Sequence, residues 1–510
     1  MASIIIIGSG VAGTLLARRL LESESGHQIT LFEAGPDFKT GDHRTWLDHL
    51  MAGKSPYDAF MDDPRTETGD IRLYSSRLFV KGGTTNHWGG WSLRFKPEDF
   101  ELKSRTGQGA DWPITYTHLA PYYAQAEALL GIEGDSGDDD PPRFGQNFPF
   151  PAAPYPLTDM PVIKALEELG ISYSHMPLAR NGSKCITTGT CGYCPVNARY
   201  SATFDLSELK EAYGRKLDIR MDSPVLGIRM NGKKHATGVR FLNRQSGQRE
   251  SMEGDIVVVC SGTVESTKLL LASANAEWPE GIGNDSGHVG RHLLGHPLVT
   301  AEGIKPGNPD GTEQELGFIT LASRHYDTPK YQREGKMLFA KESAGRTSIA
   351  REILGNVSRS EIEEKMRSKM TLRFYASVEQ FESPTNRVRL GDEQGSFGLR
   401  GTKIDYHVHD KTKKAMQAHA ERLSKVLISA GCKGESIIID SGGPTGAHLT
   451  STCRMSNAAS DGVVDKELRV HGTDNLYVCS NAVFPTVTAV NPTLTVAALA
   501  VRLADNLGVG

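Results

Sequence analysis

Cysteine is scarce in this sequence: seven residues in 510 exclude a fold that depends on a framework of disulfide bonds. Long hydrophobic runs are absent as well, since no segment reaches the roughly 18 to 20 apolar residues that a membrane-spanning helix needs. Neither charge dominates, with 57 basic and 61 acidic side chains and a formal net charge of −4. This balance excludes nucleic acid as the main partner, because binding phosphates requires a basic surface.

What remains is the composition of a globular protein, with 38% hydrophobic and 23% charged residues. A chain of this length predicts at least two domains. Met1 is followed almost at once by the apolar run Ile4 to Ile7, without the basic region and the small-residue cleavage site of a secretory signal. We therefore expect a strand at this end and a cytoplasmic location for the protein.

The first part of the chain predicts a dinucleotide-binding unit. The run Ile4 to Ile7 suits a buried parallel strand, and leucines at helical spacing follow the segment Gly8 to Gly13. Gly8 permits a tight turn, Gly10 lets the backbone approach a pyrophosphate, and Gly13 allows the helix to pack on the strand. A second strand, 28–32, ends at Glu33, whose carboxylate can accept hydrogen bonds from ribose hydroxyls. Both FAD and NAD fit this unit, and the residues expected at the nucleotide are Gly8, Gly10, Val11, Ala12, Gly13, Glu33 and Ala34.

Later segments carry further signals. The apolar run 256–259 leads into Cys260-Ser261-Gly262 and a leucine-rich helix, which repeats the pattern of strand, glycine and helix. The loop 81–90 is too rich in glycine for a strand or a helix and could wrap backbone donors around a cofactor. Distinct C-terminal segments follow at 448–455, 463–465, 468–472, 483–486 and 491–495.

In this order the segments closely resemble the glucose–methanol–choline (GMC) oxidoreductase family, over nearly the whole chain. The segments 289–297 and 386–390 fit the same family. The loop that contains Gly82 to Trp88 resembles the branch of pyranose oxidases and flavin subunits of sugar dehydrogenases, as do the segments 112–114 and 119–123.

The resemblance implies an α/β fold, with a Rossmann-type FAD-binding domain and a discontinuous α+β substrate domain built on an antiparallel sheet. The FAD-binding domain is expected at 1–110, 205–300 and 440–510, and the substrate domain at 111–204 and 301–439. The strand-like runs 372–378 and 404–409 are expected in the sheet of the substrate domain.

The same resemblance implies FAD as the cofactor. The further residues expected to bind it are Gly82, Gly83, Thr84, Asn86, His87, Trp88, Gly89, Val225, Cys260, Ser261, Gly262, Glu265, Asn481, Pro492 and Thr493. His87 stands where pyranose oxidases join a histidine to the flavin 8α-methyl group, and a histidine without this bond is the alternative. Ser480-Asn481 replace an acidic residue that is common in the family, which puts the usual contact to the ribityl chain in doubt.

His448 and Asn491 are the catalytic residues that the resemblance implies. Oxidation of an alcohol by a flavin removes a hydroxyl proton and transfers a hydride to N5, and a histidine can accept a proton near neutrality. Family alignment gives this role to His448, with Asn491 orienting the substrate hydroxyl. Asn491-Pro492 also predicts the start of the last helix. His292, His296 and His471 lie in family motifs and are expected to serve structure.

Three cysteines, Cys185, Cys191 and Cys194, lie on one glycine-containing loop. They resemble the motif that holds a [3Fe-4S] cluster in flavin subunits of sugar dehydrogenases, although the second gap is one residue shorter than expected. A zinc site that lacks its fourth ligand and inert buried thiols are the alternatives.

The expected activity is the oxidation of a secondary alcohol, at C2 or C3 of a sugar or glycoside, with electrons passed to an external acceptor. A small subunit and a cytochrome are the partners that this activity implies, and a partner that carries an export signal would place the protein in the periplasm. A polyol is a further candidate substrate. An oxidase that produces hydrogen peroxide and a non-redox lyase that contains FAD are the alternatives.

Overall fold

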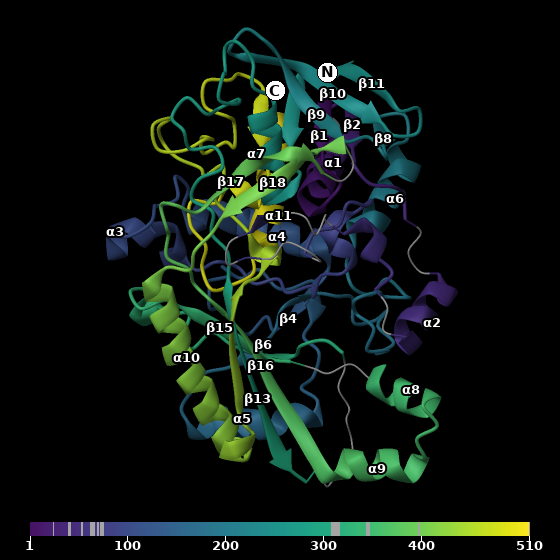
Figure 1. Cartoon of the computed structure of the whole chain (residues 1–510), viewed down its shortest axis with the longest axis vertical. Helices are drawn as coiled ribbons and strands as arrows, with labels where there is room; N and C mark the ends of the chain where they lie inside the picture. The colour runs from purple at the N-terminus through teal and green to yellow at the C-terminus, as the bar shows by residue number, and fades with distance from the viewer. Residues whose placement is uncertain are drawn as a thin grey trace.

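The computed structural model describes residues 1–23, 25–38, 42–52, 55–61, 67–68, 71, 76–307, 317–342, 347–395 and 398–508. The chain forms two parts that lie one above the other in Figure 1, with both termini in the upper part. The helices are α1 (Val11–Glu22), α2 (His43–Ala52), α3 (Leu102–Thr106), α4 (Tyr116–Leu130), α5 (Met160–Glu168), α6 (Ala202–Tyr213), α7 (Gly262–Ala272), α8 (Thr347–Leu354), α9 (Arg359–Ser368), α10 (Asp410–Ser429) and α11 (Thr493–Gly508). Among the described residues, no helix combines the length and the apolar character needed to cross a bilayer.

A parallel five-stranded sheet forms the centre of the upper part. Its order is β20 (Leu476–Val478), β12 (Ile256–Val259), β1 (Ser3–Ile7), β2 (Gln28–Phe32) and β8 (Leu217–Arg220). The isoleucines of β1 are buried on both faces of the sheet, which explains a strand without polar alternation. Ile7 lies level with Val259 on one side and Phe32 on the other. The loops that follow these three strands therefore meet at one edge of the sheet.

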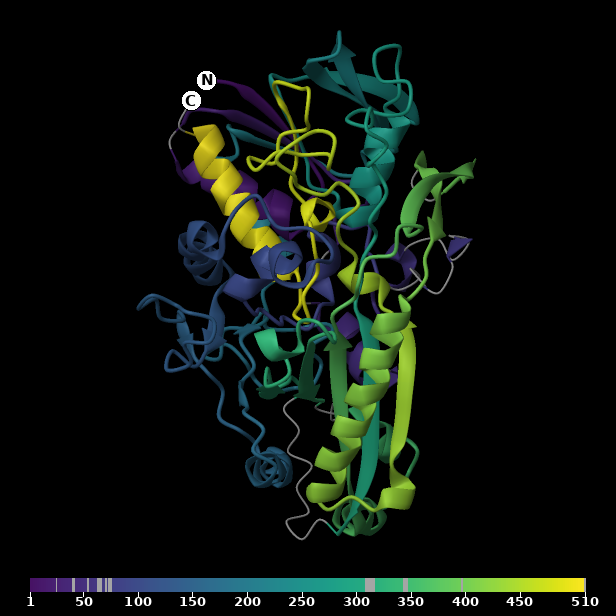
Figure 2. The ribbon, with the colours of Figure 1, turned by 90° about the vertical axis from the view of Figure 1, so that its left-hand side faces the viewer.

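Helix α1 begins at this edge and packs against α11, which also packs against α4. Figure 2 shows α11, in yellow, lying beside the purple N-terminal elements. Residues Leu494 to Ala504 are nearly all buried, as expected for a helix that is apolar on most of its faces. The parallel sheet with its packed helices confirms the predicted α/β class.

Three smaller sheets flank this core. One joins β9 (Val225–Asn231), β10 (His235–Asn243) and β11 (Gln248–Glu253), and another joins β17 (Arg387–Gln394), β18 (Arg400–Asp405) and β3 (Glu67–Thr68). The third joins β4 (Ile132–Gly134), β5 (Phe150–Pro151) and β7 (Leu178–Ala179).

A six-stranded sheet dominates the lower part. Its order is β19 (Ile438–Pro444), β13 (Pro297–Pro306), β16 (Lys369–Val378), β15 (Met337–Lys341), β14 (Leu321–Ser323) and β6 (Ser174–His175), and all its neighbours pair antiparallel. Alternate residues such as Val299 and Phe374 share a hydrophobic cluster with Leu423 of α10. This helix therefore covers one face of the sheet, as Figure 2 shows.

One expected strand lies elsewhere. Residues 372–378 fall within β16, but Ile404 and Asp405 belong to β18, which pairs with β17 outside the six-stranded sheet. The prediction that 404–409 joins the six-stranded sheet was therefore wrong. The run also ends early as a strand, since His409 caps α10 by accepting a hydrogen bond from the Lys411 amide. The domain boundaries stay predictions.

Candidate active site

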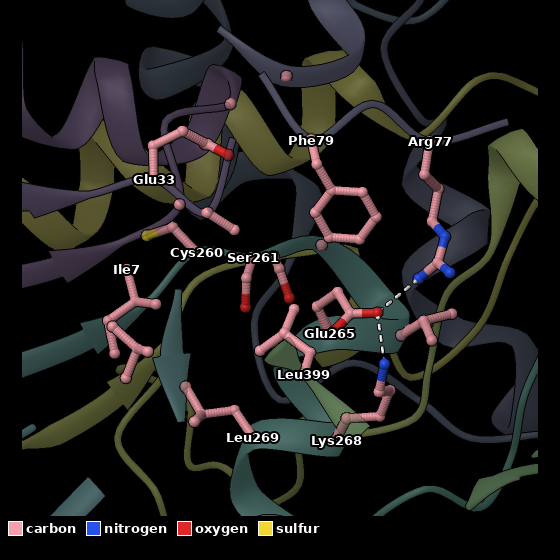
Figure 3. A pocket seen from close by; sticks show the side chains of 18 of the residues that line it. Ile7, Glu33, Arg77, Phe79, Cys260, Ser261, Glu265, Lys268, Leu269 and Leu399 are labelled. Carbon is pink, nitrogen blue, oxygen red and sulfur yellow. Dashed lines mark hydrogen bonds and ion pairs between the residues drawn. The ribbon is translucent and has the colours of Figure 1, made fainter. Parts of the chain in front are cut away.

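A cavity of about 600 Å³ opens at the edge of the parallel sheet where the strands end (Figure 3). It collects residues from every segment that the sequence assigned to the nucleotide. The expected residues that line it are Gly8, Gly10, Val11, Ala12, Glu33, Ala34, Gly83, Thr84, Trp88, Val225, Cys260, Ser261, Gly262, Glu265, Asn481 and Thr493. Gly13, Gly82, Asn86, His87, Gly89, Pro492, His448 and Asn491 are not among its lining residues.

The glycines of the first loop have distinct roles. Gly8 has a φ of +109°, which favours glycine, and a Cβ at Gly13 would lie 2.0 Å from the Gly8 carbonyl oxygen. A Cβ at Gly10 would meet no atom within 4 Å, so the start of α1 faces open space inside the cavity. Unpaired N–H groups at a helix start, with the helix dipole behind them, suit an anionic phosphate.

Glu33 is buried and held by its neighbours. Its carboxylate accepts hydrogen bonds from the Ser9 hydroxyl (2.5 Å) and the Gly35 amide (3.0 Å), and the same hydroxyl accepts one from the Gly82 amide (3.0 Å). Burial raises the pKa of Glu33, and these hydrogen bonds oppose the rise. Ser9 thus ties the loop at Gly82 to the carboxylate, a link that the glycine spacing alone did not reveal.

The loop at 81–90 splits into two sets of residues. Gly83, Thr84 and Trp88 line the cavity, whereas the Asn86 amide bonds inward to the carbonyl oxygens of Lys81 and Gly83. His87 also lies outside the lining and meets the Tyr57 ring edge-on at 6.1 Å. Burial and the neighbouring charge of Arg199 lower the pKa of His87 to about 4.

Glu265 lines the cavity and contacts two cations. Arg77 reaches its Oε1 at 3.1 Å and Lys268 reaches the same oxygen at 2.9 Å, as the dashed lines in Figure 3 mark. Neither cation was predicted from the sequence. Lys268 follows Glu265 by three residues in α7, a helical spacing that could have revealed it, whereas no local pattern points to Arg77.

His448 and Asn491 lie together beside the cavity. Asn491 Nδ2 is 2.9 Å from His448 Nε2, although 43 residues separate the two. Gly446, Ala447 and Leu449 line the cavity around His448, and Thr493 lines it just beyond Asn491. Burial and the nearby ring of His296 lower the pKa of His448 to about 3, so its imidazole is neutral at pH 7.

His296 belongs to this site, although the sequence assigned it to structure. It is fully buried, and its Nδ1 lies 2.9 Å from Nδ1 of His448, while its Nε2 lies 2.5 Å from the Thr488 carbonyl oxygen. Burial lowers the pKa of His296 to about 4. The structure thus places a third residue in contact with the expected catalytic pair.

The residues present fit FAD. The cavity combines a helix start, a buried carboxylate at Glu33 that could accept hydrogen bonds from a ribose, and the oxygen Asn481 Oδ1, which has no hydrogen-bond partner in the described structure. A buried acceptor without a partner is costly unless a ligand supplies the donor. Asn481 therefore offers an acceptor where the family commonly carries an acid.

Comparison with known proteins decides the family. Two models described as GMC oxidoreductase match residues 151–298 and 383–500, together more than half of the chain. The chain belongs to the GMC oxidoreductase family. It is thus a flavoprotein of the oxidoreductase class that acts on CH–OH donors, as the resemblance predicted. Residues 3–64 also match a model described as lycopene cyclase protein, over β1, α1 and β2.

Curated relatives of this GMC oxidoreductase match over almost their entire length. The fructose dehydrogenase large subunit of Gluconobacter japonicus is 28% identical over 99% of this chain and 97% of its own. The 2-methyl-1,2-propanediol dehydrogenase of Mycolicibacterium austroafricanum is 28% identical, over 98% and 94%. The 6'''-hydroxyparomomycin C oxidase of Streptomyces lividus is 27% identical, over 98% and 89%.

Solved structures show the same fold. The pyridoxine 4-oxidase from Mesorbium loti superposes with a TM-score of 0.65 at 20% identity, covering 99% of both chains. A mutant formate oxidase from Aspergillus oryzae superposes with a TM-score of 0.69 at 16% identity, covering 98% of this chain and 97% of that one.

The cysteine cluster that the GMC resemblance implied is not supported. Cys185, Cys191 and Cys194 are free and half-buried, and in the described part of the chain no three His, Cys, Asp or Glu residues are arranged to hold a metal ion. Backbone amides of Thr187 and Ala198 donate to the sulfurs of Cys185 and Cys194 instead. Thiols without a metal fit this arrangement of the described residues.

One part of the cavity lining was not predicted by any sequence motif. Leu390, Leu399 and Arg400 come from β17 and from the start of β18 and its preceding turn, and they line the cavity opposite the parallel sheet. These residues lie far along the chain from the glycine motifs, and their local sequence carries no nucleotide signal. Only the fold brings them to the cofactor cavity.

Proposed function

We propose that the chain oxidises a secondary alcohol of a sugar or glycoside, at C2 or C3, to the ketone and passes the electrons to an external acceptor. The observation that carries this proposal is the 2.9 Å contact between His448 and Asn491 beside the nucleotide cavity. A neutral imidazole and a carboxamide together can bind one hydroxyl group and remove its proton.

His448 acts as the base. The substrate hydroxyl replaces the Asn491 N–H at Nε2, its O–H bond breaks, and the proton moves to that nitrogen. FAD, when bound, supplies the acceptor for the hydride of the carbinol carbon. Asn491 Oδ1 has no partner in the described structure and can accept a hydrogen bond from a further donor of the substrate.

The six-stranded sheet supports a hydroxyl-rich substrate. Ser377 of β16 donates to the Ala489 carbonyl oxygen at 2.5 Å, which ties this strand to the segment before Asn491. Tyr375 and its cross-strand partner Thr300 lie on the same face as Ser377, away from α10. The ring of Tyr375 meets Trp91 edge-on at 5.6 Å. Aromatic rings beside hydroxyl groups suit a sugar, which presents both C–H and O–H groups.

The names of several relatives support the same class of substrate. A fructose dehydrogenase large subunit and two aminoglycoside oxidases, including the paromamine 6'-oxidase of Streptomyces fradiae at 26% identity, match this chain over nearly its full length. The first name also supports a partner subunit, and we propose a small subunit and a cytochrome as the route for the electrons.

Anaerobic bleaching of the flavin tests the proposal. The purified holoenzyme is mixed with fructose, other sugars, glycosides, polyols and simple alcohols, and the absorbance of the oxidised flavin is followed. We expect bleaching by a sugar or glycoside and a ketone product identified by NMR. Bleaching by simple alcohols alone would contradict the proposed substrate class, and no bleaching by any alcohol would contradict the reaction and favour the lyase.

An oxidase is the second candidate, because several relatives carry that name. Reoxidation of the bleached flavin by air, with one hydrogen peroxide formed for each substrate consumed, would establish it. Slow reoxidation by air and fast reoxidation by a quinone or ferricyanide would support the dehydrogenase.

The covalent bond between His87 and FAD stays a prediction. Acid precipitation of the holoenzyme separates the two forms, since a covalent flavin stays with the protein and a free one remains in the supernatant. The His87→Ala variant is the matched control for any colour in the pellet.

A further inference from the structure

Four groups form a continuous line of hydrogen bonds through the candidate catalytic site: the Thr488 carbonyl, His296, His448 and the Asn491 amide. The successive contacts measure 2.5, 2.9 and 2.9 Å. Both ends of the line come from the short segment 488–491, so one stretch of backbone positions the first and the last group. The two imidazole rings between them come from the residue just before β13 and from the end of the 3-10 helix Gly446–His448.

The position of the proton on each imidazole ring follows from the Thr488 carbonyl, at one end of the line. A carbonyl oxygen can only accept, so His296 must carry its proton on Nε2. Burial keeps His296 neutral at pH 7, which leaves its Nδ1 without a proton. The two facing Nδ1 atoms lie 2.9 Å apart and must share one proton, which therefore belongs to His448. Neutral His448 then has a bare Nε2, and the Asn491 amide N–H points at that nitrogen.

We propose that His296 is a positioning residue that holds His448 in the tautomer with its lone pair on Nε2. Without this constraint an imidazole can place its proton on either nitrogen, and only the bare Nε2 can take a proton from an alcohol beside Asn491. The inference rests on the proposed function, since it concerns how the base of that reaction is prepared.

His296 also stabilises the state that follows proton transfer. Once Nε2 of His448 has taken the hydroxyl proton, the ring carries a positive charge, and its Nδ1–H still donates to the neutral His296. A hydrogen bond from a charged donor is about twice as strong as one between neutral groups. The Thr488 carbonyl orients His296 for this contact, and His296 itself touches no reacting atom.

Side-chain replacements at 296 separate this role from simple packing. Gln can donate to the Thr488 carbonyl and accept from His448, whereas Leu fills space but does neither. We expect His296→Leu to slow anaerobic flavin reduction by on the order of 10- to 100-fold, and His296→Gln to stay within about fivefold of the wild type. His288→Gln is the matched control, because it changes another His–His contact away from Asn491 and should leave the rate unchanged.

The tautomer can be read without turnover. In protein labelled with 15N-histidine, the 15N shifts of His448, assigned by comparison with His448→Ala, distinguish a bare Nε2 from a protonated one. We expect a bare Nε2 in the wild type and in His296→Gln, and a mixture in His296→Leu. FAD absorbance and the melting temperature show whether each variant is folded and loaded.

Two results would overturn the proposal: a protonated Nε2 in the resting wild type, or full-speed flavin reduction in a folded His296→Leu variant. If His296→Leu fails to fold, the wild-type shifts and the rate of His296→Gln still decide. Failure of the proposed function would look different, since no alcohol would then bleach the flavin of the wild type, whatever tautomer the spectra report.

Discussion

Two pairs of contacting histidines draw three of their four members from residues 288–296, and the structure gives the pairs different outer partners. His296 contacts His448, and His288 contacts His292 through Nδ1 and Nε2 at 2.8 Å. Each pair begins at a backbone carbonyl, that of Thr488 or that of Ser460. The pairs differ at the other end, where His448 meets the Asn491 amide and His292 meets the carboxylate of Glu382.

The last partner differs in charge between the two pairs, since Glu382 is a carboxylate and Asn491 a neutral carboxamide. Arg454 Nη1 lies 3.2 Å from the same His292 nitrogen that faces Glu382. Burial tends to raise the pKa of Glu382, but the hydrogen bond with His292 and the charge of Arg454 oppose burial, and the pKa is lowered. A base must stay neutral until it acts, so the carboxamide of Asn491 is the partner that permits catalysis.

The largest effect is expected when the base itself is removed. His448→Ala should slow anaerobic flavin reduction by about 10²- to 10⁴-fold, the usual contribution of general base catalysis. The flavin content should not change, since His448 is not among the residues that line the cofactor cavity. His288→Ala, which removes a histidine of the other pair, should reduce flavin at the wild-type rate. Equal losses in both variants would contradict the assignment of the base.

Asn491→Asp gives the catalytic pair a carboxylate as its outer partner, as Glu382 is in the His288–His292 pair. A carboxylate beside Nε2 favours a proton on that nitrogen and makes His448 an imidazolium, which cannot accept the hydroxyl proton. Flavin reduction at pH 7 should slow by on the order of 100-fold. Asn491→Ala, which removes the contact without adding a charge, should lose less. A wild-type rate in Asn491→Asp would show that the neutral partner is not required.

The pairs should also differ in how acid destabilises them. Folding lowers the pKa of His448 and His296 from 6.5 to about 3 and about 4, so below pH 6.5 the unfolded chain binds more protons than the folded one. The free energy of unfolding should therefore fall as the pH drops from 6.5 toward 4. Folding lowers the pKa of Glu382 from 4.5, so its contribution is present above 4.5 and disappears below that value.

Urea unfolding at a series of pH values measures this difference. His296→Gln removes one titrating ring, so its stability should depend less on pH between 6.5 and 4 than that of the wild type. Glu382→Gln should alter the pH dependence mainly below 4.5. The same slope for all three proteins between pH 6.5 and 4 would refute the assignment of neutral rings to the catalytic pair.

The smallest effect is expected at Glu382. Glu382→Gln makes the outer partner neutral, as Asn491 is, and the ion pair it removes, to Arg454 at 3.7 Å, is partly exposed, with side-chain exposures of 15% for Arg454 and 24% for Glu382. The free energy of unfolding should fall by about 1 kcal/mol, with no change in the rate of flavin reduction. A large loss of activity would tie this pair to the catalytic site.

Local residue patterns determined the cofactor unit and the reaction class of this protein. The run Ile4 to Ile7, the glycines of the following loop and Glu33 act through contacts with near neighbours, so their spacing alone predicts the turn, the helix start and the carboxylate. The expected pair of His448 and Asn491 rested on motifs that accompany a known chemistry, and the structure places the two in contact.

Tertiary structure decided the rest, because it depends on groups that meet only after the chain has folded. Nothing near His296 indicates that it faces His448, since 152 residues separate them, and its proton is directed by a carbonyl, which every residue possesses. Arg77 and Leu399 reach the cavity in the same way, from segments without a motif. Residues 404–409 alternate between apolar and polar side chains as a strand does, yet the strand ends at Asp405 and His409 caps α10. Spacing predicts where the backbone turns, but the charge and tautomer of a buried ring depend on the partner that the fold places beside it.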